Sequence, residues 1–243
     1  MIKLLVKRDF FYTGIPMKPK DLKCPFRWQE RRPILHNRVL FVPEYYEEHK
    51  SYSFPKWQDP ELFGNSSPVC IEYCSGNGDW IIEKAKQHKE TNWVAVEQRF
   101  DRVRKIWSKM QNNNIQNLLI VCGEALTFSK DYLGHASVNG IFINFPDPWP
   151  KRTHAKHRLI RTPFVDEITR LITPKGTMTL VTDDATYCQQ MVDVVLENPS
   201  WHSAFPKPHY VLQWEGYGSS YFDALWRQKG KEIHYLNFIR NDG

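Results

Sequence analysis

Residues 69–79 read VCIEYCSGNGD, and this stretch decides the fold class. A short apolar run gives way to two glycines, Gly76 and Gly78, and a helical pattern begins at Trp80. Because glycine has no Cβ, a turn of this kind lets a ligand approach the backbone between a strand and a helix. The spacing therefore predicts a ligand site, although a tight turn that binds nothing has the same pattern.

Apolar runs and segments of helical spacing alternate along the rest of the chain. This alternation predicts an α/β fold with a mostly parallel, doubly wound sheet of the Rossmann-like kind, to which the end of the chain adds a C-terminal antiparallel strand. We expect strands at residues 69–74, 92–96, 118–122, 138–145, 176–181, 210–213 and 233–239. We expect helices at residues 80–88, 99–112, 162–172 and 185–197.

The N-terminal part lacks this alternation. Residues 1–38 hold ten Lys or Arg against three Asp or Glu, whereas the whole chain of 243 residues has a net charge of only +6. We therefore expect a basic, partly irregular extension at residues 1–67 and a folded domain at residues 68–243. A basic segment on a near-neutral body favours a polyanionic partner, and a solvated arm is the alternative.

The composition disfavours several classes of protein. No apolar run approaches the roughly 18 residues that a membrane span needs, and the first residues lack a signal-peptide cleavage site. The five cysteines include no CxxC pair, which disfavours a zinc ribbon and a disulfide framework. We expect a cytoplasmic protein with no membrane anchor and no metal. Whether it is a monomer or a homodimer stays open.

Two glutamates follow predicted strands. Glu97 ends the second strand of the folded domain, where an acid in a βαβ unit accepts hydrogen bonds from ribose hydroxyls. Ile81 replaces the third glycine of the dinucleotide motif, which disfavours a nicotinamide oxidoreductase and leaves an adenosylmethionine enzyme as the better interpretation. Glu124, after the third strand, would then face the adenine amino group, although a surface acid has the same spacing.

The strongest motif, NFPDPWPKRTHAKHR, spans residues 144–158. Asp147 lies between two prolines at a strand end, where the stiff backbone would hold its carboxylate in place. Trp149 offers a flat face for stacking. The basic residues that follow predict a phosphate-contacting patch beside a candidate catalytic carboxylate. They are Lys151, Arg152, Lys156, Arg158 and Arg161, with His154 and His157 between them.

Two more polar stretches lie near predicted helix starts. Of the pair Asp183 and Asp184, one acid would cap the following helix and leave the other free to accept hydrogen bonds from a substrate base. Residues 220–223 read SYFD, which has the look of a capping box from Ser220 to Asp223.

These motifs together resemble the bacterial tRNA (guanine-N7-)-methyltransferases of the TrmB type. The resemblance covers about residues 68–240, and its centre is FPDPWPKRxHxKxR at residues 145–158. Further support comes from Glu72 before the glycines, from Glu97, from the Thr-Asp pair at 182–183, and from SxFDxxxRxxGxxI, which begins at Ser220.

The resemblance implies a class I methyltransferase that transfers a methyl group from S-adenosyl-L-methionine to N7 of a guanosine in tRNA. The target would be the guanosine at position 46 of the variable loop, and Asp147 would be the catalytic or base-orienting acid. The implied cofactor-binding residues are Glu72, Gly76, Gly78, Glu97, Glu124 and Asp147. The implied substrate-binding residues are Lys151, Asp183, Ser220, Tyr221, Phe222 and Asp223.

The chain departs from the usual family pattern at three places. Cys74 stands where the family usually has Gly, and Glu124 stands where it usually has Asp. Ser220 and Asp223 replace the usual Thr and Glu, with the same type of hydrogen bonding.

Two other functions remain open at this point. The first is methylation of an exocyclic amine, but the Asn-Phe-Pro order at residues 144–146 is wrong for that motif, and it leaves the basic run unexplained. The second is a non-catalytic RNA-binding protein on a degenerate methyltransferase fold. Cys74 permits that interpretation, whereas the intact Asp147, Glu97 and Asp183 argue against it.

Overall fold

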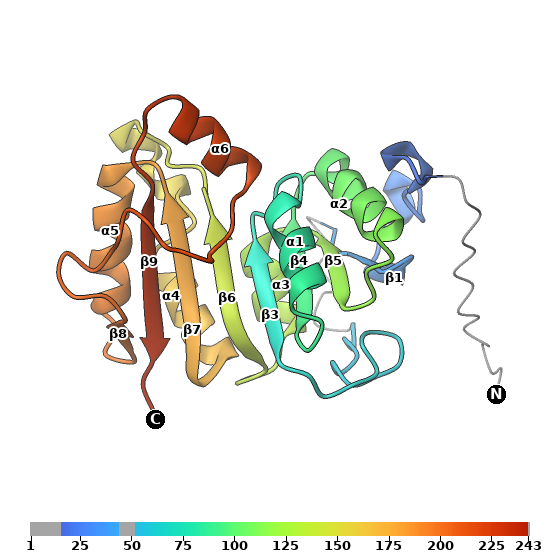
Figure 1. Cartoon of the computed structure of the whole chain (residues 1–243). Helices are drawn as coiled ribbons and strands as arrows, with labels where there is room; N and C mark the ends of the chain where they lie inside the picture. Colours follow the sequence, from blue (N-terminus) through green and yellow to red (C-terminus); the bar gives the residue numbers. More distant parts are fainter. Residues whose placement is uncertain (1–15, 44–51, 243) are drawn as a thin grey trace.

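The computed structural model describes residues 16–43 and 52–242, and the strands in this part form one nine-stranded sheet. The strand order is β1-β2-β5-β4-β3-β6-β7-β9-β8 (Figure 1). The strands are β1 (Ile34–His36), β2 (Val39–Phe41), β3 (Val69–Tyr73), β4 (Asn92–Glu97), β5 (Leu118–Cys122), β6 (Val138–Asn144), β7 (Ile172–Thr182), β8 (Trp201–Ser203) and β9 (His234–Arg240). The helices are α1 (Asp79–Gln87), α2 (Phe100–Asn112), α3 (Ala125–Tyr132), α4 (Thr162–Leu171), α5 (Ala185–Leu196) and α6 (Tyr221–Gln228).

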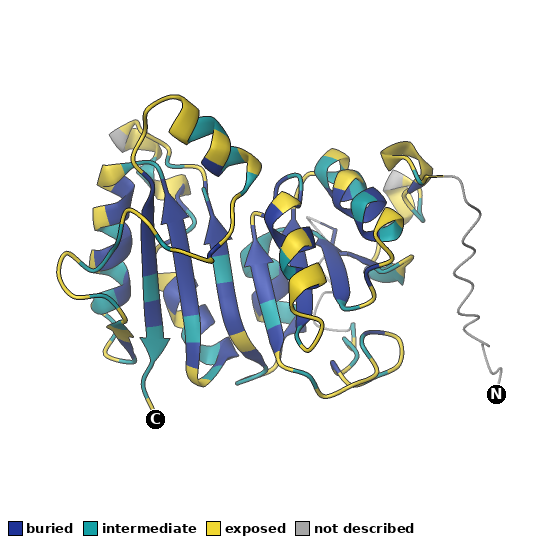
Figure 2. Cartoon of the chain, in the orientation of Figure 1, coloured by how far each residue is buried: buried dark blue, intermediate teal, exposed yellow. Residues whose placement is uncertain are grey.

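The strand pairing confirms the predicted fold class. The six strands from β2 to β7 in the sheet order pair in parallel. The C-terminal strand β9 runs antiparallel to β7, as expected. One apolar cluster packs α1 and α2 on one face of the sheet, and a second packs α3, α4 and α5 on the other. Figure 2 shows buried strands between helices whose outer faces are exposed.

The spacing of apolar residues explains which face each helix buries. In α2, Val103, Ile106, Trp107 and Met110 are buried, at the i, i+3, i+4 and i+7 positions that form one stripe of a helix. Charged or polar residues occupy most of the remaining positions of this helix, so one apolar stripe packs on the sheet.

The sheet changes direction at β3, which lies between β4 and β6. The chain leaves β3 through α1 toward β4, whereas β6 pairs on the opposite side. Ligands of open α/β sheets bind outside the carboxyl ends of the strands at such a switch point. Here those ends bring together the glycine loop after β3 and the proline-rich loop after β6.

The N-terminal part contributes two strands that the sequence pattern does not reveal. β2 pairs in parallel with β5, with Val39 opposite Ile120, and β1 pairs antiparallel with β2. The preceding residues dock on α2, where the Arg104 guanidinium donates to the Pro19 carbonyl at 2.8 Å and the Ser108 hydroxyl donates to the Met17 carbonyl at 2.7 Å. The boundary at residue 67 stays a prediction.

Two other expectations differ from the structure. The predicted strand at 210–213 is wrong, because only Val211 pairs there, in an isolated bridge to Tyr235. Helix α3 was not expected, since its sequence ALTFSKDY is short and mixes polar and apolar residues without a clear period.

Candidate active site

The turn between β3 and α1 depends on left-handed backbone conformations. The angle φ is +60° at Cys74, +57° at Gly76 and +77° at Gly78. A Cβ on Gly78 would lie 2.7 Å from Cγ1 of Ile106, so α2 packs directly against this glycine. A Cβ on Gly76 would meet nothing closer than the Phe222 ring at 3.8 Å. Gly78 therefore permits close packing, whereas Gly76 leaves its backbone accessible to a ligand.

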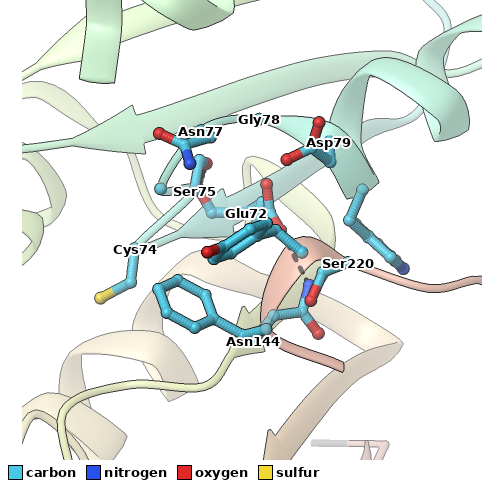
Figure 3. Close-up of a pocket in the computed structure, with 12 residues that line it drawn as sticks. Glu72, Cys74, Ser75, Asn77, Gly78, Asp79, Asn144 and Ser220 are labelled. Atoms are coloured by element: carbon cyan, nitrogen blue, oxygen red, sulfur yellow. Dashed lines mark hydrogen bonds between the residues drawn. The ribbon is translucent and has the colours of Figure 1, made fainter. Parts of the chain in front are cut away.

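Cys74 adopts its left-handed conformation with a side chain present. Such a conformation costs a non-glycine residue on the order of 1 kcal/mol, which accounts for the usual glycine at this place. In Figure 3 the Cys74 side chain extends away from Glu72. The thiol therefore leaves the space beside that carboxylate open.

Glu97 is buried at the end of β4 and holds the glycine loop. Its Oε2 accepts a hydrogen bond from the Gly76 amide at 2.9 Å, and its Oε1 accepts one from the Arg99 amide at 2.8 Å. The Arg102 guanidinium lies 3.7 Å from Oε2. Because each carboxylate oxygen has two lone pairs, Glu97 can still accept hydrogen bonds from hydroxyl groups of a ligand.

Glu72 is the most deeply buried acid of the site, only 2% exposed, near the end of β3. Its Oε1 accepts a hydrogen bond from Nδ2 of Asn144 at 2.8 Å, and the Asn144 Oδ1 accepts one from the Tyr217 hydroxyl at 2.7 Å. Its Oε2 has no hydrogen-bond partner among the described residues. Burial raises the pKa of Glu72 to about 8.

Glu72 lines a narrow cleft between the glycine loop and the start of α6, and its Oε2 is the buried oxygen without a hydrogen-bond partner among the described residues. Figure 3 shows Glu72 and Asn144 joined by their hydrogen bond between these two walls. A buried carboxylate oxygen without a donor is costly to maintain, and a cationic group of a ligand removes that cost. The Glu72 carboxylate therefore suits a ligand with an ammonium group. The lining residues of the cleft are Glu72, Cys74, Ser75, Gly76, Asn77, Gly78, Asp79, Trp80, Asn144, Ser220, Tyr221 and Phe222.

Glu124 is the N-cap of α3. Its two carboxylate oxygens accept hydrogen bonds from the amides of Leu126 at 2.9 Å and Thr127 at 2.6 Å. The side chain thus has a structural role that the sequence pattern did not indicate. Glu124 is not among the residues that line the cleft, and its expected contact with adenine stays a prediction.

Asp147 lies in the loop after β6, outside the lining of the cleft, and its side chain is exposed. The loop is unusual because Phe145 and Trp149, two bulky residues, both have positive φ, +53° and +42°. Conformations of this kind persist where the surrounding structure imposes them and are concentrated at functional sites. The loop therefore presents the Asp147 carboxylate to solvent at the carboxyl edge of the sheet.

The basic run after Asp147 divides into exposed and buried members. Lys151 is exposed at the start of a short 3-10 helix, η4 (Arg152–His157), and Lys156 is exposed within it. Trp149, 37% exposed, lies with its ring 5.2 Å from the ring of His157 and 5.8 Å from that of His154. These side chains form an exposed aromatic and basic surface.

The assignment of Arg158 to the phosphate-contacting patch is wrong. Its side chain is buried, its Nε donates to the Pro148 carbonyl at 2.7 Å, and its guanidinium stacks 4.8 Å above the Tyr187 ring. A further hydrogen bond joins it to Gln190 of α5. Arg158 thus fixes the proline-rich loop to the body of the protein.

Of the pair Asp183 and Asp184, one residue caps the following helix as expected, and the substrate contact of the other stays a prediction. Asp184 caps α5 by accepting a hydrogen bond from the Tyr187 amide at 2.7 Å. Asp183 lies beside it, 10% exposed, and accepts a hydrogen bond from Nζ of Lys231 at 2.8 Å. A substrate would have to share Asp183 with this lysine.

The residues at the start of α6 have different surroundings. Ser220 caps the helix by accepting a hydrogen bond from the Asp223 amide at 3.1 Å, which confirms the predicted helix start. Tyr221 is 54% exposed. Asp223 is buried and accepts hydrogen bonds from the Tyr235 hydroxyl at 2.7 Å and from Nε of Arg227 at 2.9 Å. Ser220, Tyr221 and Phe222 line the cleft, whereas Asp223 anchors the helix.

Sequence reasoning missed two residues that shape the site, Asn144 and Tyr217. A polar residue at the end of the buried run VNGIFIN is a signal for Asn144, because strand ends at a switch point face the ligand. Tyr217 lies between two glycines in a segment without periodicity, and no local pattern indicates that its hydroxyl reaches β6.

Comparison with known proteins agrees with the geometry. A family model described as "Putative methyltransferase" matches residues 66–236. A tRNA (guanine-N(7)-)-methyltransferase of Chlamydia trachomatis is 49% identical over 93% of this chain and 100% of its own length. One from Rubrobacter xylanophilus is 29% identical over 79% of this chain and 85% of its own length.

Among solved structures, the 16S rRNA methyltransferase KamB has a TM-score of 0.57 at 12% identity, over 79% of this chain and 96% of its own. At that identity the likeness concerns the fold, which is that of a Rossmann-like methyltransferase. The match over most of the chain at nearly half identity carries more weight. Together with the cleft at the switch point and the proline-rich loop beside it, it shows that the chain belongs to the tRNA (guanine-N7-)-methyltransferase family.

Proposed function

We propose that this protein transfers the methyl group of S-adenosyl-L-methionine to N7 of a guanosine in tRNA, at position 46 of the variable loop. The observation that carries the proposal is the orphaned Oε2 of Glu72, buried at the switch point of a methyltransferase sheet. The exposed Asp147 and Lys151 at the same edge of the sheet supply the other half of the argument.

The cleft and the acids near it would together offer a group for each polar part of the cofactor. Glu72 would accept the methionine ammonium, and its raised pKa falls again when a cation replaces the proton. Glu97 would accept the ribose hydroxyls with the lone pairs that the glycine loop leaves free. Gly76 and Gly78 would let the cofactor approach the backbone, and Glu124 and Asp147 would complete the pocket. When bound, the cofactor supplies an electrophilic methyl group on a sulfonium.

The proposed methyl transfer does not require a general base. Guanine N7 has an in-plane lone pair and needs no deprotonation, so orientation of the base accounts for much of the catalysis. The purine ring gains positive charge as the methyl group arrives. The Asp147 carboxylate would oppose that charge and orient the base from the edge of the sheet.

The exposed residues around the cleft would bind the RNA. N7 of a stacked base is hard to reach, so the nucleotide must be presented or flipped. Trp149 and Tyr221 offer exposed rings for stacking, and Lys151 offers a charge for the phosphate backbone. Ser220 and Phe222 line the cleft, Asp223 anchors the helix that they begin, and Asp183 would contact the substrate beside Lys231.

Methyl transfer from labelled S-adenosyl-L-methionine to unmodified tRNA tests the proposal, followed by borohydride–aniline cleavage at 7-methylguanosine. A single cut in the variable loop is expected. Transfer without a cut would indicate another atom, including an exocyclic amine, and mass spectrometry of the nucleosides would identify it. Failure to bind the cofactor at all would favour a non-catalytic RNA-binding protein.

A further inference from the structure

The two walls of the cleft are joined by one chain of hydrogen bonds. It runs from Oε1 of Glu72 through the Asn144 amide to the Tyr217 hydroxyl, with donor–acceptor distances of 2.8 and 2.7 Å. Glu72 and Asn144 belong to the central strands. Tyr217 belongs to the segment that leads into α6, three residues before Ser220. All three side chains are more than nine-tenths buried.

Tyr217 is held tightly on the side of this segment. Its ring stacks on Trp214 at 5.2 Å and packs against Trp80 at 5.3 Å and Tyr235 at 5.3 Å. Its carbonyl accepts a hydrogen bond from Nε1 of Trp80 at 3.0 Å. The ring fixes the path of the segment, so the hydroxyl is left with one specific task, the hydrogen bond to Asn144.

The amide of Asn144 has two orientations of similar shape but opposite polarity. The Tyr217 hydroxyl donates to Oδ1, which leaves Nδ2 to face Glu72. With the orientation fixed in this way, Oε1 is occupied and Oε2 has no donor among the described residues. Without the hydroxyl, Oδ1 loses its donor and nothing on this side selects one orientation of the amide.

We infer that Tyr217 is a positioning residue that acts through Asn144 on Glu72 and couples cofactor binding to RNA binding. The inference rests on the proposed function. The same segment ends in Ser220, Tyr221 and Phe222, which line the cleft and which the proposed function places against the RNA. A group bound beside Glu72 would therefore stabilise the hydrogen bonds that hold this wall, and RNA bound to the wall would stabilise the same hydrogen bonds. Thermodynamic linkage makes this effect reciprocal.

The test compares Tyr217→Phe with Tyr73→Phe. Tyr73 is a matched control, because its buried hydroxyl also makes one side-chain hydrogen bond of 2.7 Å, to Ser129, and it does not line the cleft. Calorimetry measures the affinity of each full-length protein for S-adenosylhomocysteine, which cannot be turned over, without and with unmodified tRNA. Thermal melting of each variant measures the loss of stability that both variants share because each lacks a buried hydroxyl.

In the unaltered protein and in Tyr73→Phe, tRNA should strengthen binding of S-adenosylhomocysteine at least fivefold, a typical coupling between two sites. In Tyr217→Phe, binding without tRNA should weaken about five- to tenfold, and the enhancement by tRNA should fall below twofold. Equal values for Tyr217→Phe and Tyr73→Phe would overturn the inference, as would the absence of enhancement in the unaltered protein. A protein that binds neither ligand would instead refute the proposed function.

Discussion

Nδ2 of Asn144 lies 2.8 Å from Oε1 of Glu72, so the last residue of β6 holds a carboxylate of β3 across the switch point of the sheet. The amide satisfies one oxygen and leaves the other without a donor. The site is therefore built around an acid that is half satisfied before any ligand arrives.

Glu72→Gln should stabilise the ligand-free protein at high pH and abolish cofactor binding. Because the folded-state pKa is raised from 4.5 to about 8, ionisation of Glu72 opposes folding. The increase in the free energy of unfolding of the variant over the unaltered protein should be absent below pH 4.5, grow as the pH rises, and level off above pH 8. Each unit of pKa shift corresponds to about 1.4 kcal/mol, so the gain reaches several kcal/mol at most.

Melting temperatures from pH 4.5 to 8.5 measure this gain. Glu83→Gln is the control, since Glu83 is an exposed residue whose carboxylate pairs with Lys86, and it should show no such rise with pH. A Glu72→Gln curve parallel to that of the unaltered protein would refute the assigned burial cost.

Asp147→Ala should reduce methyl transfer by at least a hundredfold while the fold stays intact. The side chain is exposed, so its loss should change the melting temperature by no more than about 1–2 °C. Binding of tRNA should be largely retained. Single-turnover transfer with saturating tRNA measures the chemical step directly, and Asp147→Asn separates the charge from the hydrogen-bonding capacity. Near-normal turnover in both variants would remove Asp147 from the mechanism.

Lys151→Ala should weaken tRNA binding more than cofactor binding. Because Lys151 is exposed, its expected contact is a phosphate, and its loss should lower the slope of log affinity against log salt by roughly one. Filter binding of tRNA between about 50 and about 200 mM salt measures the slope. An equal loss of tRNA and cofactor binding would indicate misfolding instead.

Cys74→Gly should stabilise the protein by about 0.5–1 kcal/mol, or roughly 2–3 °C in melting temperature. The reason is the left-handed conformation, φ +60°, that Cys74 adopts with a side chain. Ala136→Gly is a matched control, because Ala136 has φ +47° in a turn distant in sequence from the glycine loop. Both variants should gain a similar amount of stability. Their cofactor affinity should stay within about threefold of that of the unaltered protein. A loss of stability in Cys74→Gly alone would mean that the thiol packs favourably.

Gly78→Ala should be far more harmful than Gly76→Ala. Both glycines have positive φ, but only the new Cβ at residue 78 would approach Ile106 to 2.7 Å. We expect a cost of roughly 2–4 kcal/mol at Gly78 and about 1 kcal/mol at Gly76, from denaturant unfolding. Equal costs would show that the contact with α2 relaxes freely.

The sequence was most informative where the local pattern and the tertiary role coincide. The third strand of the predicted domain, 118–122, matches β5. A short, continuous apolar run of this length is typical of a buried strand in a parallel sheet. The acids at 72, 97 and 147 lie at the carboxyl edge of the sheet because each is at or just after the carboxyl end of a parallel strand. The predicted cap of α5 is present, as Asp184 needs only its own helix.

The remaining features depend on partners far away in the chain. Arg158 was assigned to the exposed patch because its charge is visible in the sequence and its Tyr187 partner is not. Strands β1 and β2 have three residues each; β1 pairs with β2, and β2 pairs with β5, about 80 residues later in the chain. No described helix is long and apolar enough to cross a membrane; the cytoplasmic location stays a prediction.

The parallel pairing of β2 with β5 bears on how the chain assembles as it is synthesised. Val39 meets Ile120, so β2 leaves the ribosome well before its partner exists. Contacts between residues so far apart in sequence require a long loop to close. Because closing the loop costs conformational entropy, such contacts form late in folding. Met17 and Pro19, which dock on α2, therefore wait for the core strands to fold, although they are made before those strands.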